Sequence, residues 1–438
     1  MIPCNETHDP KLASWVRAAN APESEFPIQN LPFGIFTDTK RGKAGVGIAI
    51  GDQIVDLAAT LERGLLSGKG PIAATACGER GLVALMALGQ DYASALRFEL
   101  SRLLRKGTRH QHDVELCLVA MSDVQMQLPE PIANFTDFAA SVNHVGNLGR
   151  MFAPGSPIRE NFKYLPTAYH GRASSVVVSG TRCRRPLGQF KPQNSSAPRF
   201  GPTRQLDFEL EVGFYVGSGN RLGQAVPLVE AAGHVFGLCL VNDWSARDIL
   251  AWEMQPLGPF LGKSFLTSVS PWVVTLEALA PFRVAAAGRA ADDPPLLPHL
   301  RSEVDRLHGG IDIALEVWLQ SRAMRDSGLD PVKISEPRFA DQYWTIFQML
   351  THHTSNGCNL VPGDLIASGT VSGPRDNELG CLLEAVAIGA KPIALPNGEE
   401  RRFLEDGDEI VFRGLCKRAG FRTIGFGKCR GIVEAASA

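Results

Sequence analysis

The chain has 438 residues, of which 44% are hydrophobic and 21% charged, and its formal net charge at pH 7 is -2. A chain of this length exceeds what one hydrophobic core usually organises, so we expect two domains. The charge balance excludes a basic footprint for nucleic acid and favours a small-molecule substrate.

Cysteine usage and the N-terminal sequence indicate where the protein works. The nine cysteines are scattered singly and form no CxxC pair, which is typical of reduced thiols in a cytoplasm. The first residues, MIPCNETHDPKLASW, lack the apolar core of a signal peptide. No run reaches the roughly 20 apolar residues that a membrane span needs. We therefore expect a soluble, cytoplasmic protein without membrane or nucleic-acid partners.

Residues 1–128 are expected to form a small β-rich domain with helical additions. Two apolar runs, Ala44–Ile50 and residues 53–57, flank a Gly51-Asp52 dipeptide that suits a tight hairpin. From Asp91 onward, apolar residues recur at helical spacing until Gly107. The prolines of the segment LPEP at 128–131 resist both helix and interior strand, so we place the boundary to a second domain, 129–438, there.

The second part of the chain alternates short β runs with Gly/Pro turns. Residues 208–216, FELEVGFYV, show a period of two, and residues 235–241 form a continuous apolar run typical of a buried central strand. Residues 365–368 and 409–412 also predict strands, and residues 341–353 predict a helix. Many strands with few helices between them indicate a mixed, mainly antiparallel β architecture.

Four acids are candidates for a metal site. Glu209 and Glu211 lie two apart on the predicted strand, so their side chains share one face about 7 Å apart. Asp243 follows the buried run, and Asp137 lies beside aromatic residues. Oxygen ligands of this kind suit Mg²⁺, Mn²⁺ or Ca²⁺, not zinc. Taken singly, each acid is more often a turn or cap residue, and spacing alone does not show that they converge.

Other charged residues have both a catalytic and a structural interpretation. His144 could act as a base if a carboxylate orients it, and Glu384, in the apolar run GCLLEAV, is a candidate partner. His352 and His353 suit the end of a helix. Residues 242–265 set Asp243, Arg247, Asp248 and Lys263 among aromatic and aliphatic residues, which also fits a solvated surface helix. No GxSxG elbow, P-loop or HExxH motif occurs.

Long motifs spread over nearly the whole chain resemble one enzyme family. They include FPIQNLPFGIF, IGDQIVDL, YHGRASSVVVSGT, RRPLGQ, DFELE, NDWSARD, PLGPFLGKSF and THHTSNGCNLVPGDLIASGT. In this order they resemble the fumarylacetoacetate hydrolases, which cleave β-diketo acids at the end of tyrosine, phenylalanine and homogentisate breakdown. The resemblance implies a mainly β fold with some α, in which an N-terminal SH3-like barrel precedes a catalytic C-terminal mixed β-roll. It also implies a homodimer.

The resemblance further implies roles for individual residues. A divalent cation, Mg²⁺ or Ca²⁺, is expected at Asp137, Glu209, Glu211 and Asp243, and a second ion near Lys263 and Thr267. The water-activating pair corresponds to His144 and Glu384. The cations that face the developing carbanion correspond to Arg247 and Lys263, and contacts to the substrate correspond to Tyr169 and Thr370.

Four positions of the substrate pocket depart from the family pattern. Where the family typically has tyrosine, arginine, glutamine and a second tyrosine, this chain has Ala139, Ala153, Leu250 and Met254. Arg150 is a candidate replacement for the missing arginine. The leading hypothesis is hydrolysis of fumarylacetoacetate to fumarate and acetoacetate. The alternatives are a related diketo acid with a less polar tail, another reaction such as decarboxylation, hydration or acylpyruvate hydrolysis, and a binding protein without activity.

Overall fold

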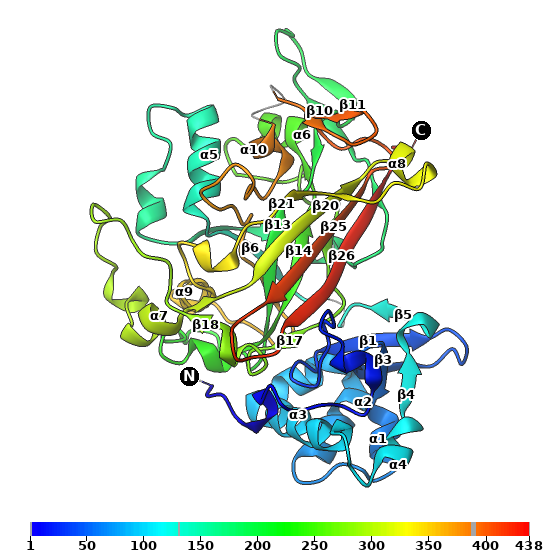
Figure 1. Cartoon of the computed structure of the whole chain (residues 1–438). Helices are drawn as coiled ribbons and strands as arrows, with labels where there is room; N and C mark the ends of the chain where they lie inside the picture. Colours follow the sequence, from blue (N-terminus) through cyan, green and yellow to red (C-terminus); the bar gives the residue numbers. More distant parts are fainter. Residues whose placement is uncertain (1, 130–131, 387–390, 438) are drawn as a thin grey trace.

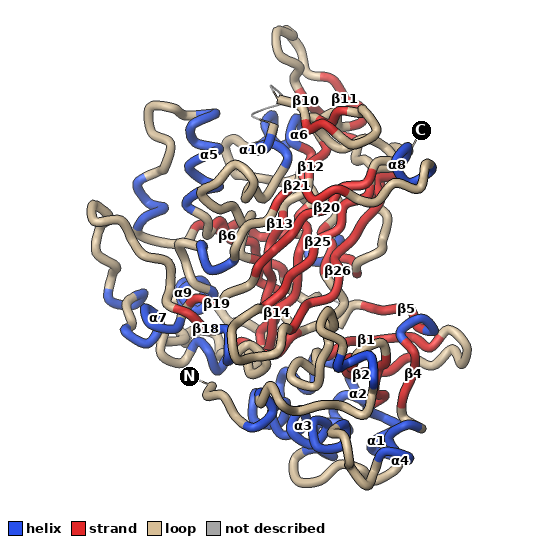
Figure 2. Tube along the Cα trace, viewed as in Figure 1, coloured by secondary structure: helices blue, strands red, loops and turns tan. Residues whose placement is uncertain are grey.

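The computed structural model describes residues 2–129, 132–386 and 391–437. A smaller N-terminal part lies against a larger body whose centre is made of strands (Figures 1 and 2). Of the predicted linker, Glu130 and Pro131 lie outside the described residues, so the domain boundary stays a prediction. None of the described helices has the length and apolar character that crossing a membrane requires.

The N-terminal part is built on one antiparallel sheet. Its strand order is β4 (Leu118–Ala120), β3 (Gln53–Asp56), β2 (Ala44–Ile50), β1 (Phe33–Asp38) and β5 (Val124–Gln127). The predicted hairpin is confirmed, since Ile50 pairs with Gln53 and Gly51 takes a φ of 60°, which glycine tolerates best. The helices are α1 (Leu57–Glu62), α2 (Gly70–Leu88), α3 (Gln90–Leu104) and α4 (Gln111–Glu115). Helix α3 confirms the predicted helix, whereas α2 was not predicted.

The larger body contains a mixed eight-stranded sheet. Seven strands follow the order β7 (Thr167–Gly171), β6 (Phe135–Ala139), β22 (Leu365–Ala367), β13 (Leu210–Val216), β14 (Val235–Asp243), β16 (Thr267–Val269) and β8 (Val176–Val178), and β17 (Val274–Thr275) pairs with β14. Only the pairs β22–β6 and β16–β8 of this described sheet are parallel. The mainly antiparallel architecture predicted from the sequence is therefore confirmed.

A second, five-stranded sheet packs against the first. Its order is β21 (Val332–Ser335), β20 (Ala314–Gln320), β25 (Glu409–Cys416), β26 (Ile424–Glu434) and β9 (Cys183–Arg184). Two-stranded ladders join β10 (Leu187–Phe190) to β11 (Arg199–Pro202), β12 (Leu206–Asp207) to β15 (Ser245–Ala246), β18 (Arg283–Val284) to β19 (Gly310–Ile311), and β23 (Ile393–Ala394) to β24 (Glu400–Arg401). The helices are α5 (Val142–Phe152), α6 (Arg247–Glu253), α7 (Glu303–His308), α8 (Arg322–Asp326), α9 (Ile346–Thr354) and α10 (Leu382–Ala385).

Both faces of the eight-stranded sheet are covered by apolar side chains. Phe214 and Leu240 face the five-stranded sheet and share a core with Phe412. On the other face, Tyr215 and Val241 belong to a cluster with the N-terminal part. Every residue of β13 and β14 is buried for this reason. The acids at the end of these strands consequently emerge in a protein interior and not on a solvated edge.

Two predicted element boundaries were wrong. The strand predicted at 208–216 begins at Leu210, because Leu206–Asp207 pair with a different strand, β15. The helix predicted at 341–353 begins only at Ile346. There the Thr345 hydroxyl accepts a hydrogen bond from the backbone N–H of Gln348, and the Gln348 side chain accepts one from Thr345 N–H, both at 3.1 Å. This capping box fixes the start of α9.

Candidate active site

The register of the eight-stranded sheet brings the candidate residues to one edge. Asp137 on β6 stands opposite Tyr169 on β7, and Asp243 at the end of β14 stands opposite Thr267 on β16. Glu211 belongs to β13, which lies between β22 and β14. Side chains from five strands of this sheet therefore meet, although Asp137 and Asp243 are more than a hundred positions apart in the sequence.

The structure brings the four candidate acids together as one buried cluster. Carboxylate oxygens of Asp137, Glu209, Glu211 and Asp243 all lie within 4.8 Å of one another, and each residue is at most 5% exposed. Burying like charges at this distance is unfavourable unless positive charge compensates them. A turn or cap role does not explain such a cluster.

The cluster fits a cation. Both carboxylate oxygens of Glu211 are buried and have no hydrogen-bond partner among the described residues. Burial and the neighbouring Asp243 raise the pKa of Asp137 well above its usual range, and burial and Asp137 raise the pKa of Glu211 in the same way. Unpartnered carboxylate oxygens are the ligands that hard divalent ions prefer. The donor set therefore suits a metal ion such as Mg²⁺ or Ca²⁺.

Two protein cations neutralise only part of the cluster. Lys263 Nζ donates to Asp243 Oδ2 at 2.7 Å and also to Glu209. Arg247 donates to Glu209 Oε1 at 2.6 Å and to Asp207 Oδ2 at 2.8 Å. Burial alone would raise the pKa of Glu209, but Lys263 and Arg247 outweigh it and hold that pKa well below its usual range. Neither cation donates to Asp137 or Glu211, so protons or a metal ion must compensate the charge of these two acids.

Lys263 and Thr267, near which the resemblance implies a second ion, both donate hydrogen bonds to Asp243. Lys263 supplies an ammonium donor and not a ligand oxygen, and burial lowers its pKa less than Asp243 and Glu209 raise it. Thr267 donates its hydroxyl to Asp243 Oδ1 at 3.1 Å, and Tyr169 donates its hydroxyl to Asp243 Oδ2 at 2.6 Å. These side chains orient the carboxylate of Asp243 toward the cluster.

His144 and Glu384 form a buried pair on the other side of the site. Ser141 caps α5 and accepts a hydrogen bond from His144 N–H, which places the histidine in the first turn of the helix. His144 Nδ1 lies 2.8 Å from Glu384 Oε2. Burial opposes ionisation of Glu384, but His144 and the donors Asn147 and Ser372 outweigh it and lower its pKa to about 2. Glu384 is therefore an ionised acceptor at neutral pH.

One cavity of about 330 Å³ is lined by His144 and by three of the four clustered acids, whereas Asp243, Thr267 and Glu384 lie behind its lining. The predicted site residues that line it are Asp137, Ala139, His144, Tyr169, Glu209, Glu211, Arg247, Leu250, Met254, Lys263 and Thr370. Ala153 does not line the cavity, because it caps the far end of α5 and is exposed. Arg150 is outside the lining as well, and its guanidinium donates to the side chain of Asn147.

Several residues of the site were not predicted from the sequence. Asp207 accepts hydrogen bonds from the backbone N–H groups of Leu382 and Leu383 at 2.8 and 3.1 Å, so it links Arg247 to the helix that carries Glu384. Asn147 donates to Glu384 at 2.7 Å. Asp207 continues the two-residue alternation of the acids in DFELE, and Asn147 lies one helical turn after His144. Both periodicities were available signals.

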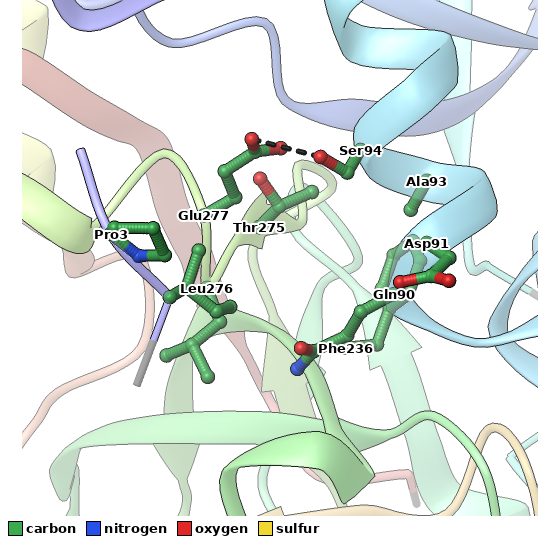
Figure 3. Close-up of a pocket in the computed structure, with 10 residues that line it drawn as sticks. Pro3, Gln90, Asp91, Ala93, Ser94, Phe236, Thr275, Leu276 and Glu277 are labelled. Carbon is green, nitrogen blue, oxygen red and sulfur yellow. Dashed lines mark hydrogen bonds between the residues drawn. The ribbon is translucent and has the colours of Figure 1, made fainter. Parts of the chain in front are cut away.

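A second cavity, of about 230 Å³, lies where α3 meets the segment that follows β17 (Figure 3). Glu277 is its most buried acid, and its carboxylate accepts hydrogen bonds from Asn5 at 2.6 Å and from Ser94 at 2.9 Å. Arg97, which is fully buried, lies 3.9 Å from the other oxygen. These contacts join the N-terminal segment, α3 and the larger body, so the cavity belongs to a structural junction.

Family models cover most of the chain. The model described as "Fumarylacetoacetate (FAA) hydrolase C-terminal" matches residues 133–434, and the one described as "Fumarylacetoacetase N-terminal" matches residues 29–129. The chain belongs to the fumarylacetoacetate hydrolase family. Its relatives include the fumarylacetoacetase of Arabidopsis thaliana, which is 46% identical over 94% of this chain and 96% of the relative. The fumarylacetoacetase of Homo sapiens is 45% identical over 94% of this chain and 97% of the relative.

Membership of the fumarylacetoacetate hydrolase family confirms the predicted enzyme class and fold. The chain is a hydrolase that acts on carbon–carbon bonds. A solved fumarylacetoacetate hydrolase from Exiguobacterium antarcticum superposes with a TM-score of 0.50 and 17% identity, over 92% of this chain and 99% of that one. The mainly β, two-part fold predicted from the sequence is therefore correct.

Proposed function

We propose that this enzyme hydrolyses a carbon–carbon bond of a β-diketo acid with the help of a divalent cation. One observation carries the proposal: three of the four clustered acids and His144, which is hydrogen-bonded to Glu384, line the same cavity. A metal site next to a histidine base matches the needs of a hydrolysis in which water attacks a polarised carbonyl group.

Fumarylacetoacetate is the first candidate substrate, with fumarate and acetoacetate as products. Two observations support it: the relatives from plants and mammals are named fumarylacetoacetase, and their sequences are about 45% identical to this chain. The enzyme would then complete the breakdown of tyrosine, phenylalanine and homogentisate. We also propose a cytoplasmic homodimer, as the family resemblance implies, and sedimentation of the purified protein would test the dimer.

The cation is proposed to be Mg²⁺ or Ca²⁺, held by Asp137, Glu209, Glu211 and Asp243. When bound, it would supply Lewis-acid polarisation of the oxygens of a 1,3-diketone. Lys263 and the Tyr169 hydroxyl keep Asp243 in place, because both donate to the same carboxylate oxygen, Oδ2. The protein therefore provides an oriented set of oxygen ligands before the substrate arrives.

His144 is the proposed base for the attacking water. Because Glu384 is ionised, it can only accept hydrogen bonds, and the proton of His144 is therefore held on Nδ1. The other ring nitrogen, Nε2, is left free to accept a proton. Asn147 and Ser372 donate to Glu384 and fix its plane. The proton of the attacking water passes to Nε2 as the new carbon–oxygen bond forms, and the resulting imidazolium is stabilised by Glu384.

Arg247 and Lys263 are the proposed stabilisers of the negative charge that follows. When the tetrahedral intermediate collapses, the electron pair of the breaking carbon–carbon bond moves onto the leaving group as an enolate. The Nη2 group of Arg247 is buried and, among the described residues, has no acceptor, so it is available to a developing oxyanion. The proton taken by His144 then passes to the enolate carbon, which balances the reaction.

A related diketo acid with a less polar tail is a second candidate substrate. The lining of the cavity supports it, because Ala139, Leu250 and Met254 replace the polar residues that the family typically has there. Losing the partner of a buried carboxylate typically costs about 2–5 kcal/mol of binding. The metal cluster and the His144–Glu384 pair are the same for either substrate.

The reaction is tested by adding fumarylacetoacetate to the purified enzyme with Mg²⁺ and following the loss of diketone absorbance. We expect His144→Ala to reduce the rate by about 10²–10⁴-fold, while the matched variant of an exposed histidine, His112→Ala, keeps it. Hydrolysis of alkyl-tailed diketo acids alone would favour the second candidate. Metal binding without turnover of any diketo acid, or full turnover by His144→Ala, would refute the proposed reaction.

A further inference from the structure

On helix α5, two apolar side chains, Leu148 and Phe152, follow His144 along one face toward the surface of the protein. His144, Leu148 and Phe152 are spaced four residues apart, so they lie on one face of the helix, about 6 Å apart along its axis. His144 and Leu148 line the cavity, and Phe152 is 62% exposed one turn further on. Leaving a phenylalanine exposed at this position contributes little to folding, because little of its surface is removed from water.

A second apolar segment borders the same cavity on the loop after α6. Met254 and Pro259 line the cavity, while Leu257 is 97% and Phe260 68% exposed. The loop is held by its own hydrogen bonds: Glu253 Oε1 accepts from Phe260 N–H at 2.9 Å and from Gly262 N–H at 2.7 Å. Hydrogen bonds to Glu253 therefore fix the backbone of this loop, in which the exposed Phe260 directly follows the lining residue Pro259.

The cations at the cavity are already engaged by the protein. Lys263 is bound by Glu209 and Asp243, and Arg247 is bound by Asp207 and Glu209. Arg247 Nη2, which has no partner among the described residues, is buried beside the acidic cluster. Arg150 donates to Asn147 and lies outside the lining. The described lining thus offers no free cation to a charged group at the outer end of a substrate.

From these observations we infer that the natural substrate is a β-diketo acid with an extended, uncharged apolar tail. The tail leaves the cavity between Leu148 and Met254 and lies against Phe152 and Phe260. The inference rests on the proposed carbon–carbon hydrolysis but not on fumarylacetoacetate as the substrate. Each methylene that becomes half buried should raise kcat/KM about twofold, since full burial is worth about fourfold.

The test compares 3,5-dioxoalkanoates with methyl, butyl and octyl tails, with Mg²⁺ present. The unchanged enzyme should hydrolyse the octyl substrate with a kcat/KM about sixteenfold above that of the butyl substrate, because the octyl tail has four more methylenes. Phe152→Ser and Phe260→Ser should each lower this octyl-to-butyl ratio about threefold or more. Leu222→Ser is the matched control, because Leu222 is 79% exposed in the loop that follows the far end of β13, and it should leave the ratio unchanged.

The outcomes separate this inference from the proposed reaction. If none of the dioxoalkanoates and no fumarylacetoacetate is hydrolysed, the proposed reaction itself fails. If all tails are hydrolysed at equal kcat/KM, or the two serine variants keep the ratio, the reaction stands and the apolar tail is refuted. Light scattering gives the oligomeric state of each variant: a dimer that dissociates in Phe152→Ser or Phe260→Ser shows that a second copy covers this surface, which also overturns the inference.

Discussion

Replacing Glu384 by glutamine probes the hydrogen bonds on which the proposed base depends. The carboxylate accepts from His144 Nδ1 at 2.8 Å, from Asn147 at 2.7 Å and from the Ser372 hydroxyl at 2.8 Å. A glutamine side chain of the same size has only one accepting atom, so at least one donor loses its partner. It also has no charge with which to stabilise a protonated His144.

The pKa of Glu384 sets the expected size of the stability change. That pKa falls from an ordinary value of 4.5 to about 2, mainly because His144 outweighs the effect of burial. Since each pKa unit corresponds to about 1.4 kcal/mol, the ionised carboxylate contributes up to about 3 kcal/mol at pH 7. A depressed pKa means that this contribution is complete above pH 4.5 and is lost as the pH falls through 2.

The assay combines kinetics with unfolding. We expect Glu384→Gln to lower kcat by about 10²–10⁴-fold, the range for losing a general base. Its free energy of unfolding by urea should be about 2–3 kcal/mol lower at pH 7, and the difference should shrink below pH 4.5. Binding of Mg²⁺, measured by calorimetry, should stay unchanged, because Glu384 is not one of the four clustered acids.

Two results would contradict this reasoning. A kcat within about threefold of the unchanged enzyme would show that the carboxylate does not serve the base, against the expected loss of at least 10²-fold. A stability difference that stays constant between pH 7 and pH 3 would show that the effect of the substitution is steric and not electrostatic.

Three further predictions follow from the structure. Glu211→Gln should abolish the rise in Tm that Mg²⁺ produces, because both oxygens of Glu211 are free to bind it, and a rise equal to that of the unchanged enzyme would refute this. Asp305→Asn should stabilise the protein by up to about 3 kcal/mol at pH 8 but not at pH 3. The reason is that burial raises the pKa of Asp305 from 3.8 to about 6, so the unchanged protein loses stability as the pH rises through that range. Urea unfolding at the two pH values checks it, and equal effects would contradict it. Phe412→Ala should cost about 3–5 kcal/mol in urea unfolding, because Phe412 is fully buried between the sheets, whereas a cost below about 1 kcal/mol would disprove close packing there.

Local patterns in the sequence were sufficient for the elements whose signals are local. The hairpin at Gly51-Asp52 and the buried run that became β14 both follow from short motifs. The predicted start of α9 at residue 341 was wrong, although Thr345 and Gln348 carry the capping signature that marks the true start at Ile346. A capping box thus decides the start of α9, whereas pairing with a distant strand, β15, decides where β13 begins.

Convergence of the acids could not be predicted from spacing. Asp137 reaches Glu211 only because β6 pairs in parallel with β22, and β22 pairs with β13. Nothing in the sequence around Asp137 specifies that register. The family resemblance implied the roles of these residues but not the burial of β13 on both faces. That burial is seen only in the structure, where the second face of β13 packs on the N-terminal part. The pairing of strands that are distant in sequence therefore determines that the acids converge, which the local sequence around each acid does not specify.

Residues 242–265 hold three of the proposed catalytic and metal-binding residues next to a loop that we propose contacts the substrate tail. Asp243, Arg247 and Lys263 are buried and hydrogen-bonded, so moving any of them would leave a buried charge without its partner. Between Arg247 and Lys263, Met254 is partly exposed and carries no comparable constraint. The loop that returns the chain to Lys263 is held through backbone N–H groups that donate to Glu253, so its own side chains are free to change without displacing the lysine. If the proposed roles are correct, a substitution in this loop should change the preference for the substrate tail and leave the hydrogen bonds of Asp243, Arg247 and Lys263 in place.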